Sequence, residues 1–162
     1  MKRRILVLAS LVFMAAIAVG LSAQQQPARG TPPAPPKPLT VVKFMGHDAV
    51  AGCSKAITIA NTPDYSVTCS NRTGPGVVEI HTKETDVIYV VDGAATFITG
   101  GKAIDVDSKN PLQPRGKDIQ GGEVHHLVKG DVIVVPAGIP HWFKEVPSTI
   151  NYYVVKVHPP AK

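Results

Sequence analysis

The stretch GDVIVVPAGIPHWFKE, at residues 130–145, carries the clearest indication of the fold. It opens with a Gly-Asp pair, which is a typical turn signal, and continues as a run of apolar β-branched residues that favours a strand. Two prolines then bend the chain, because the proline ring fixes one backbone angle and removes a hydrogen-bond donor. The stretch predicts two strands, over residues 131–135 and 141–146, on either side of this bend.

Comparable runs of β-branched and aromatic residues recur along the chain. Many are bounded by turn signals such as Asp92-Gly93 and Gly121-Gly122. No window holds a convincing helical period, and residues 102–120 are expected to form an exposed loop. The further strands are predicted at residues 39–45, 55–60, 65–70, 77–81, 86–91, 94–99, 123–128 and 149–157. Closely spaced strands with tight turns predict an all-β fold, an antiparallel sandwich or barrel.

The composition excludes several classes of protein. A chain of 162 residues suits one ordinary domain. A charged content of 18%, with 15 prolines and 14 glycines, argues against a helical bundle or coiled coil. The net charge of +5 owes three charges to Lys2, Arg3 and Arg4, without which 14 basic residues face 12 acidic ones. The remaining basic residues form no stripe, so binding to nucleic acid is not expected.

The N-terminus has the three parts of a secretory signal peptide. Residues 2–4 are basic, residues 5–21 are almost entirely apolar, and Ser22-Ala23 provides small residues for cleavage. We therefore expect a signal peptide at residues 1–23 and a periplasmic or secreted mature protein with no membrane attachment. The alternative is an uncleaved anchor, because the apolar run is close to the shortest length that crosses a bilayer.

The rest of the chain divides by composition into three parts. Residues 24–38 contain six prolines and almost no apolar residues, which predicts an extended linker with polyproline II character. Residues 39–158 are expected to form the folded domain, and residues 159–162 a C-terminal tail. In an oxidising compartment Cys53 and Cys69 can form a disulfide, which would stabilise the fold by about 3 kcal/mol. Two separate buried thiols are the alternative.

Four residues that can bind metal adjoin strongly apolar strands: Glu79, His81, Asp86 and His141. Glu79 and His81 point to the same face of one predicted strand, because successive strand residues alternate. Burying two uncompensated carboxylates costs several kcal/mol, whereas a divalent cation would neutralise them. Mixed nitrogen and oxygen donors suit one divalent transition metal, namely Mn, Fe, Zn, Ni, Co or Cu. Taken singly, each of the four has a plainer interpretation as a solvated or hydrogen-bonded polar residue.

The spacing of these residues resembles that of the cupin superfamily, whose second motif has the form G-x5-P-x-G-x2-H-x3-N. The residues that match this motif are Gly130, Pro136, Gly138 and His141, with Glu145 in place of the asparagine. The first motif, G-x5-H-x-H-x3–4-E-x6-G, is matched in variant form by EIHTKETDVIYVVDG at residues 79–93. There Glu79 stands at the first histidine position and Asp86 at the glutamate position.

The resemblance implies a cupin barrel, which is an antiparallel double-stranded β-helix or jelly roll. It also implies a metal inside the barrel, held by Glu79, His81, Asp86 and His141. Because aspartate is shorter than glutamate, Asp86 is expected to orient another ligand if its carboxylate falls short of the metal. Glu79 is also the candidate catalytic residue, acting as a general base when it leaves the metal.

Aromatic residues near the motifs are expected to form the pocket wall, namely Phe143, Tyr89 and Tyr152. Lys156 shares the last strand with Tyr152, although a lysine at a strand end is usually solvated. Cupins include oxygenases such as dioxygenases, isomerases and lyases, and also proteins that only bind small molecules. The resemblance therefore implies a metalloenzyme acting on a small molecule, with a non-catalytic small-molecule or metal-binding module as the alternative. A homodimer is compatible with both.

Overall fold

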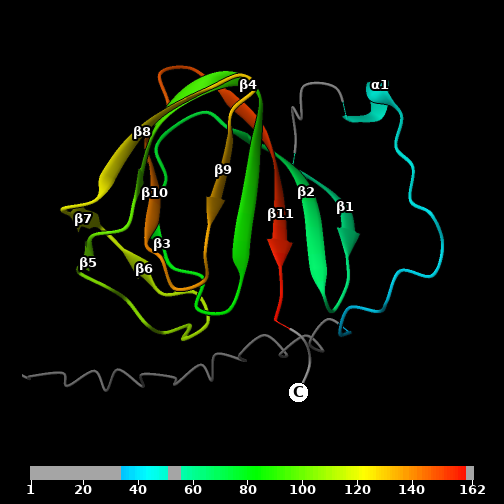
Figure 1. The fold of residues 1–162 in the computed structure, drawn as a ribbon, viewed down its shortest axis with the longest axis horizontal. Helices are drawn as coiled ribbons and strands as arrows, with labels where there is room; N and C mark the ends of the chain where they lie inside the picture. The colour runs from blue at the N-terminus through cyan, green and yellow to red at the C-terminus, as the bar shows by residue number, and fades with distance from the viewer. Residues whose placement is uncertain (1–33, 51–55, 160–162) are drawn as a thin grey trace, which may run out of the picture. The chain divides into compact units, whose positions relative to one another are not determined.

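The computed structural model describes residues 34–50 and 56–159 (Figure 1). In that part of the chain, no helix is long and apolar enough to cross a membrane. The predicted signal peptide at residues 1–23 and Cys53 lie outside the described residues. The signal peptide and the disulfide with Cys69 therefore stay predictions.

The described residues form one helical turn and eleven strands. The elements are α1 (His47–Val50), β1 (Ile57–Asn61), β2 (Tyr65–Arg72), β3 (Val78–Glu79), β4 (Thr85–Thr99), β5 (Lys102–Ile104), β6 (Arg115–Gly116), β7 (Asp118–Gln120), β8 (Glu123–Val128), β9 (Val132–Val135), β10 (His141–Glu145) and β11 (Ile150–Val157). All of the strand pairs are antiparallel. The all-β antiparallel prediction is confirmed.

The long strand β4 joins the two halves of the main sheet. Its first half pairs with β9 and β11, and its second half pairs with β8 and β10. The sheet follows the order β1-β2-β11-β4-β10-β3-β6, while β5 and β7 form a separate two-stranded ribbon. Figure 1 shows β4 bending between the two sets of partners, so the sheet curls around a common interior.

The strand β4 changes partners just after Gly93, where the sequence predicts a reversing turn. That prediction is wrong, because the chain continues as a strand through Asp92 and Gly93. Gly93 has a φ of +83°, and two residues earlier the pairing with β11 skips Val91, because Asn151 lies opposite Asp92 and Tyr152 opposite Val90. A glycine at positive φ is typical of a β-bulge as well as of a turn, and a bulge bends a strand without ending it. The two expected strands 86–91 and 94–99 are thus one.

Two other expectations are corrected. Residues 39–45 form no strand, and Val42 and Phe44 are 94% and 85% exposed. A β-branched run alone does not make a strand, because a strand needs a partner for its backbone groups. Residues 102–120 form no simple loop but contain β5, β6 and β7. These strands are too short for their sequences to show an alternating pattern.

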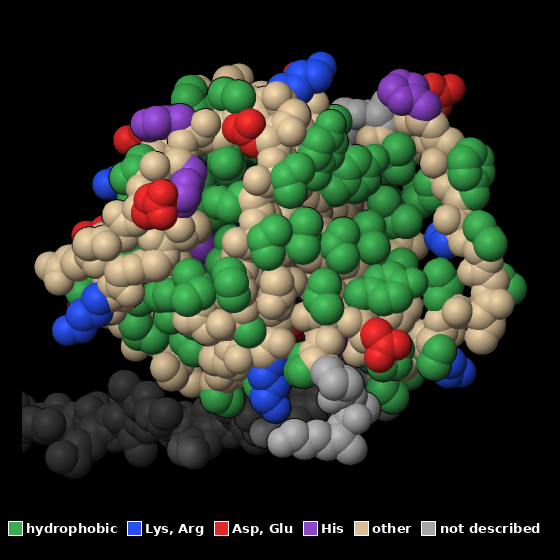
Figure 2. All heavy atoms as spheres, viewed as in Figure 1, with side chains coloured by type: hydrophobic (Ala, Val, Ile, Leu, Met, Phe, Trp, Pro, Cys, Tyr) green, Lys and Arg blue, Asp and Glu red, His purple; other side chains and the backbone are tan. Residues whose placement is uncertain are grey.

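The interior is packed by alternate residues of the strands. In β4, Ile88 and Val90 are buried together with Phe97, while Tyr89 points outward and is 45% exposed. The strand alternation that buries its neighbours excludes Tyr89 from the interior, so its expected role in the pocket wall is wrong. On the outside Tyr89 lies opposite Val132 of β9. The face drawn in Figure 2 exposes many hydrophobic side chains.

Candidate metal centre

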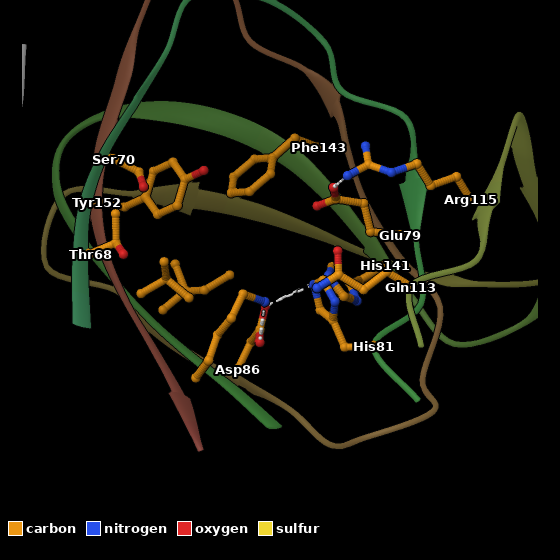
Figure 3. A pocket seen from close by; sticks show the side chains of 13 residues that line it. Thr68, Ser70, Glu79, His81, Asp86, Gln113, Arg115, His141, Phe143 and Tyr152 are labelled. Carbon is orange, nitrogen blue, oxygen red and sulfur yellow. Dashed lines mark hydrogen bonds and ion pairs between the residues drawn. The ribbon is translucent and has the colours of Figure 1, made fainter. Parts of the chain in front are cut away.

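A cavity of about 290 Å³ opens inside the barrel between β2, β3, β4, β10 and β11 (Figure 3). Glu79 enters it from β3 and His141 from β10, and these two residues lie directly opposite each other in the strand pairing. His81 follows Glu79 by two residues and faces the same cavity. Residues far apart in the sequence are therefore brought together by the antiparallel pairing of two short strands.

Glu79, His81 and His141 each offer a ligand atom within 4.8 Å of the others. Both histidines are buried, with exposures of 6% and 4%, whereas Glu79 is half-buried. Two imidazole nitrogens and one carboxylate oxygen are a donor set that suits a divalent transition metal. The structure thus brings together three of the four residues that the sequence suggested as ligands.

The backbone sets the orientation of His141. Its Nδ1 donates to the carbonyl oxygen of Ile139 at 3.1 Å, in the tautomer that this contact requires. That hydrogen bond leaves the lone pair of Nε2 available as a metal ligand. In many metal-binding histidines, one ring nitrogen is likewise hydrogen-bonded while the other binds the metal. The ring also packs against Phe97, with centroids 5.9 Å apart. The hydrogen bond and the ring packing therefore fix the orientation of His141 at the cavity wall.

His81 is neutral because of its surroundings. Burial, assisted by the charges of Lys156 and His141, lowers its pKa from 6.5 to about 4. Its Nδ1 is buried without a hydrogen bond, and the nearest carboxylate oxygen is Oε2 of Glu84, at 3.8 Å. A metal-binding imidazole must be deprotonated, so the lowered pKa favours ligation. After a small adjustment, Glu84 could accept a hydrogen bond from Nδ1–H, which would stabilise Nε2 as the ligand atom.

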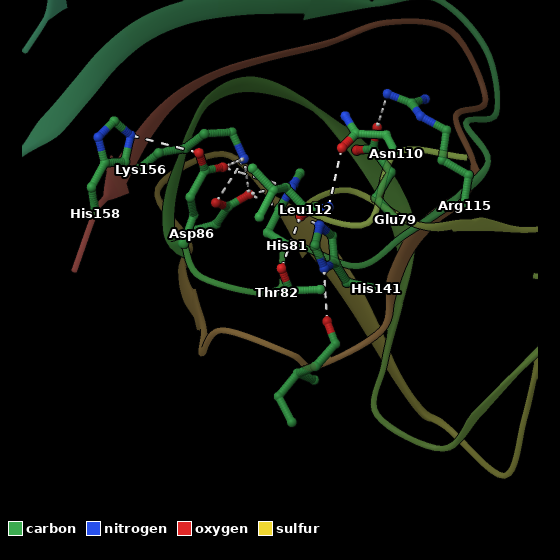
Figure 4. Close-up of polar contacts among 12 residues, drawn as sticks. Glu79, His81, Thr82, Asp86, Asn110, Leu112, Arg115, His141, Lys156 and His158 are labelled. Atoms are coloured by element: carbon green, nitrogen blue, oxygen red, sulfur yellow. Dashed lines mark hydrogen bonds and ion pairs between the residues drawn. The ribbon is translucent and has the colours of Figure 1, made fainter. Parts of the chain in front are cut away.

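Asp86 does not belong to the three-residue group. Both of its carboxylate oxygens accept hydrogen bonds from Nζ of Lys156, at 2.8 and 2.9 Å (Figure 4). Oδ2 also lies 3.4 Å from Nε2 of His81 and 3.9 Å from Nε2 of His141. Asp86 as a metal ligand therefore stays a prediction, and in this arrangement its carboxylate is bound by Lys156.

Glu79 also has a cation beside it. Nη2 of Arg115, in β6, lies 3.2 Å from Oε1 of Glu79, and the two residues are opposite each other in the pairing of β3 with β6. The two carboxylates of the cavity are thus matched by Arg115 and Lys156. The expectation of two uncompensated carboxylates is wrong, because these two cations line the same cavity.

The sequence analysis did not identify Arg115 as a residue of the site, and it expected Lys156 to be solvated. A signal for Lys156 exists, since Tyr152, Val154 and Lys156 alternate along β11 and all three line the cavity. No comparable signal exists for Arg115, which comes from a segment expected to be a loop. Phe143 and Tyr152 line the cavity as expected, with ring centroids 5.1 Å apart.

The lowered pKa of His81 makes the stability of the metal-free protein depend on pH. Between about pH 6.5 and 4 the unfolded chain binds a proton at this histidine and the folded chain does not, so stability falls as the pH is lowered. We expect His81 to account for a loss of about 2 kcal/mol between about pH 7.5 and 5, measured by urea unfolding. Glutamine cannot be protonated in this pH range. The free energy of unfolding of His81→Gln should therefore fall by about 2 kcal/mol less than that of the wild type over the same range. An identical pH dependence of the two proteins would contradict the assignment.

Comparison with known proteins agrees with the fold. A family model for cupins matches residues 36–162. A protein from Bacillus halodurans has a similar structure, with 14% identity, a TM-score of 0.52, and coverage of 74% of this chain and 83% of that chain. A protein from Thermus thermophilus has 16% identity, a TM-score of 0.52, and coverage of 74% of this chain and 100% of that chain. No curated protein matches the chain.

Proposed function

Because the chain belongs to the cupin family, we propose that it is an exported protein that binds one divalent transition metal and acts on a small molecule in the barrel cavity. The observation that carries the proposal is the grouping of Glu79, His81 and His141 within 4.8 Å at the wall of a cavity. Export rests on the predicted signal peptide at residues 1–23.

The three residues supply the donors, and the cavity supplies a protected place for a reaction. A metal held there would act as a Lewis acid, or would activate oxygen if it were iron or copper. Glu79 is the most exposed of the three and is the group best placed to take a proton from a bound molecule. Phe143 and Tyr152 restrict the entry of water from their side of the cavity. These features support a metalloenzyme of the oxygenase, isomerase or lyase type.

One observation favours a second candidate, a binding module without turnover. Both carboxylates of the cavity have a cation beside them, so neither requires a metal for charge balance. A cavity of this kind is able to bind a small polar molecule directly. The two functions differ in their response to a chelator, which abolishes the first and spares the second.

Elemental analysis tests the proposal. We expect the wild-type protein to hold about one equivalent of metal and to lose it, together with any turnover, on treatment with a chelator. His81→Ala should abolish the bound metal, whereas His126→Ala, at an exposed histidine of β8, should retain it. A metal-free wild type that stays metal-free after incubation with Mn²⁺, Fe²⁺ and Zn²⁺ would contradict the proposal.

Glu79→Ala separates two roles for the glutamate. Loss of the metal would identify Glu79 as a ligand. Full metal content with loss of turnover would instead identify it as a residue that moves protons or positions the substrate.

A further inference from the structure

Resting on the metal site proposed above, we infer that the metal-loaded cavity takes a small carboxylate, which Arg115 binds in place of Glu79.

The charge of the cavity changes sign when a metal enters. Glu79 and Asp86 are balanced by Arg115 and Lys156, and Glu84 adds one negative charge 3.7 Å from Lys156. With the histidines neutral, a divalent cation changes the total of these five groups from −1 to +1. Unbalanced charge inside a protein wall is costly, because interactions there are poorly screened. The loaded cavity therefore favours an anionic ligand.

Of the two cations, Arg115 is the one able to change partners. Lys156 is held by both oxygens of Asp86 and lies 3.7 Å from Glu84. Arg115 makes one contact with Glu79, at 3.2 Å, and its side chain is 55% exposed. When Glu79 turns its carboxylate to a metal, Arg115 loses most of that interaction. A guanidinium that has been holding a carboxylate is then available for another one.

The shape of the site sets the size and polarity of the ligand. The main cavity measures about 290 Å³, at the small end of ligand sites. Thr68 and Ser70 lie on the side opposite Arg115 and offer hydroxyl groups (Figure 3). A second cavity of about 220 Å³ shares Arg115 and Gln113 with the first, so Arg115 stands at the junction of the two. These features fit a hydroxy carboxylate of a few carbons, with its carboxylate at Arg115.

The exchange makes metal and carboxylate bind cooperatively. A metal competes with Arg115 for Glu79, and a bound carboxylate removes that competition. By linkage, each ligand then raises the affinity for the other by the same factor. We expect a factor of about 10, within the usual range for two coupled sites.

Calorimetric titration with Mn²⁺ and L-malate tests the inference. Mn²⁺ is chosen because it forms the weakest complexes with free malate among the candidate metals. In the wild type, saturating Mn²⁺ should strengthen malate binding by about 10-fold. The neutral analogue 1,2,4-butanetriol should show no binding.

Two variants identify the residue responsible. Arg115→Met should weaken malate binding by about 10-fold or more while Mn²⁺ binding is kept or becomes a few-fold tighter, because Glu79 no longer has a competing partner. Lys117→Met removes the same charge from an exposed position two residues away and should bind both probes as the wild type does. Thermal unfolding of each variant, compared with the wild type, checks that it is folded.

The outcomes separate the inference from the proposed function. Unchanged malate affinity in Arg115→Met, or equal affinity for malate and the triol, would overturn the carboxylate inference while Mn²⁺ binding upheld the metal site. Failure of the wild type to bind Mn²⁺ or any other candidate metal would overturn the metal site itself, and with it the exchange at Glu79.

Discussion

Replacing His141 with glutamine is expected to lower the affinity for a divalent metal by at least about 100-fold, since even residues that only orient metal ligands change affinity by 10- to 100-fold. His141 supplies one of three donors, and its Nε2 faces the cavity because Nδ1 is bound to the Ile139 carbonyl. Glutamine has a similar size and retains much of the packing against Phe97. It lacks the basic nitrogen that a transition metal prefers.

The affinity is measured by titrating Zn²⁺ or Mn²⁺ in competition with a chromophoric chelator. His126→Gln is the matched control, because it makes the same exchange at an exposed histidine of β8 and should bind metal as the wild type does. Unfolding by urea shows whether the His141 variant is folded. A folded His141→Gln protein with an affinity within a few-fold of the wild type would remove His141 from the site.

The local pattern of residues 130–145 was sufficient to predict both the turn and the bend of this stretch. Gly130 and Gly138 have φ values of +93° and +82°, which glycine adopts readily and other residues rarely do. The strands on either side, β9 and β10, begin or end within one residue of the expected bounds. Such features depend on neighbours in the sequence and are therefore visible in it. The same holds for Glu79 and His81, which share a face because they are two residues apart.

The partners of the two cavity carboxylates were not visible in the sequence. Asp86 and Lys156 are 70 residues apart and meet because β4 and β11 pair in register. Arg115 reaches Glu79 through β6, a strand of two residues without a recognisable pattern. Long-range register decides which charges meet, and a single sequence does not specify that register. The charge balance of the site, and with it the class of ligand, therefore required the structure.

Replacing Gly93 with alanine is expected to destabilise the protein by at least about 3 kcal/mol, because two penalties combine at this position. Gly93 has a φ of +83°, which costs any L-residue energy. A Cβ atom there would also lie 2.0 Å from the carbonyl oxygen of Thr149, a backbone atom at the entry to β11. Relief of that contact requires β4 and β11 to move apart at Gly93, which lies between the bulge at Val91 and the point where β4 changes partners. The free energy of unfolding is measured by urea titration.

Gly100→Ala separates the two penalties. Gly100 has a comparable φ of +72°, but a Cβ atom added there meets nothing within 4 Å. That variant should therefore lose only about 1–2 kcal/mol, the cost of the backbone conformation alone. The difference between the two variants measures how closely β4 and β11 approach at Gly93. Equal losses would mean that this approach is not tight, and that β4 bends at Gly93 for reasons of backbone conformation only.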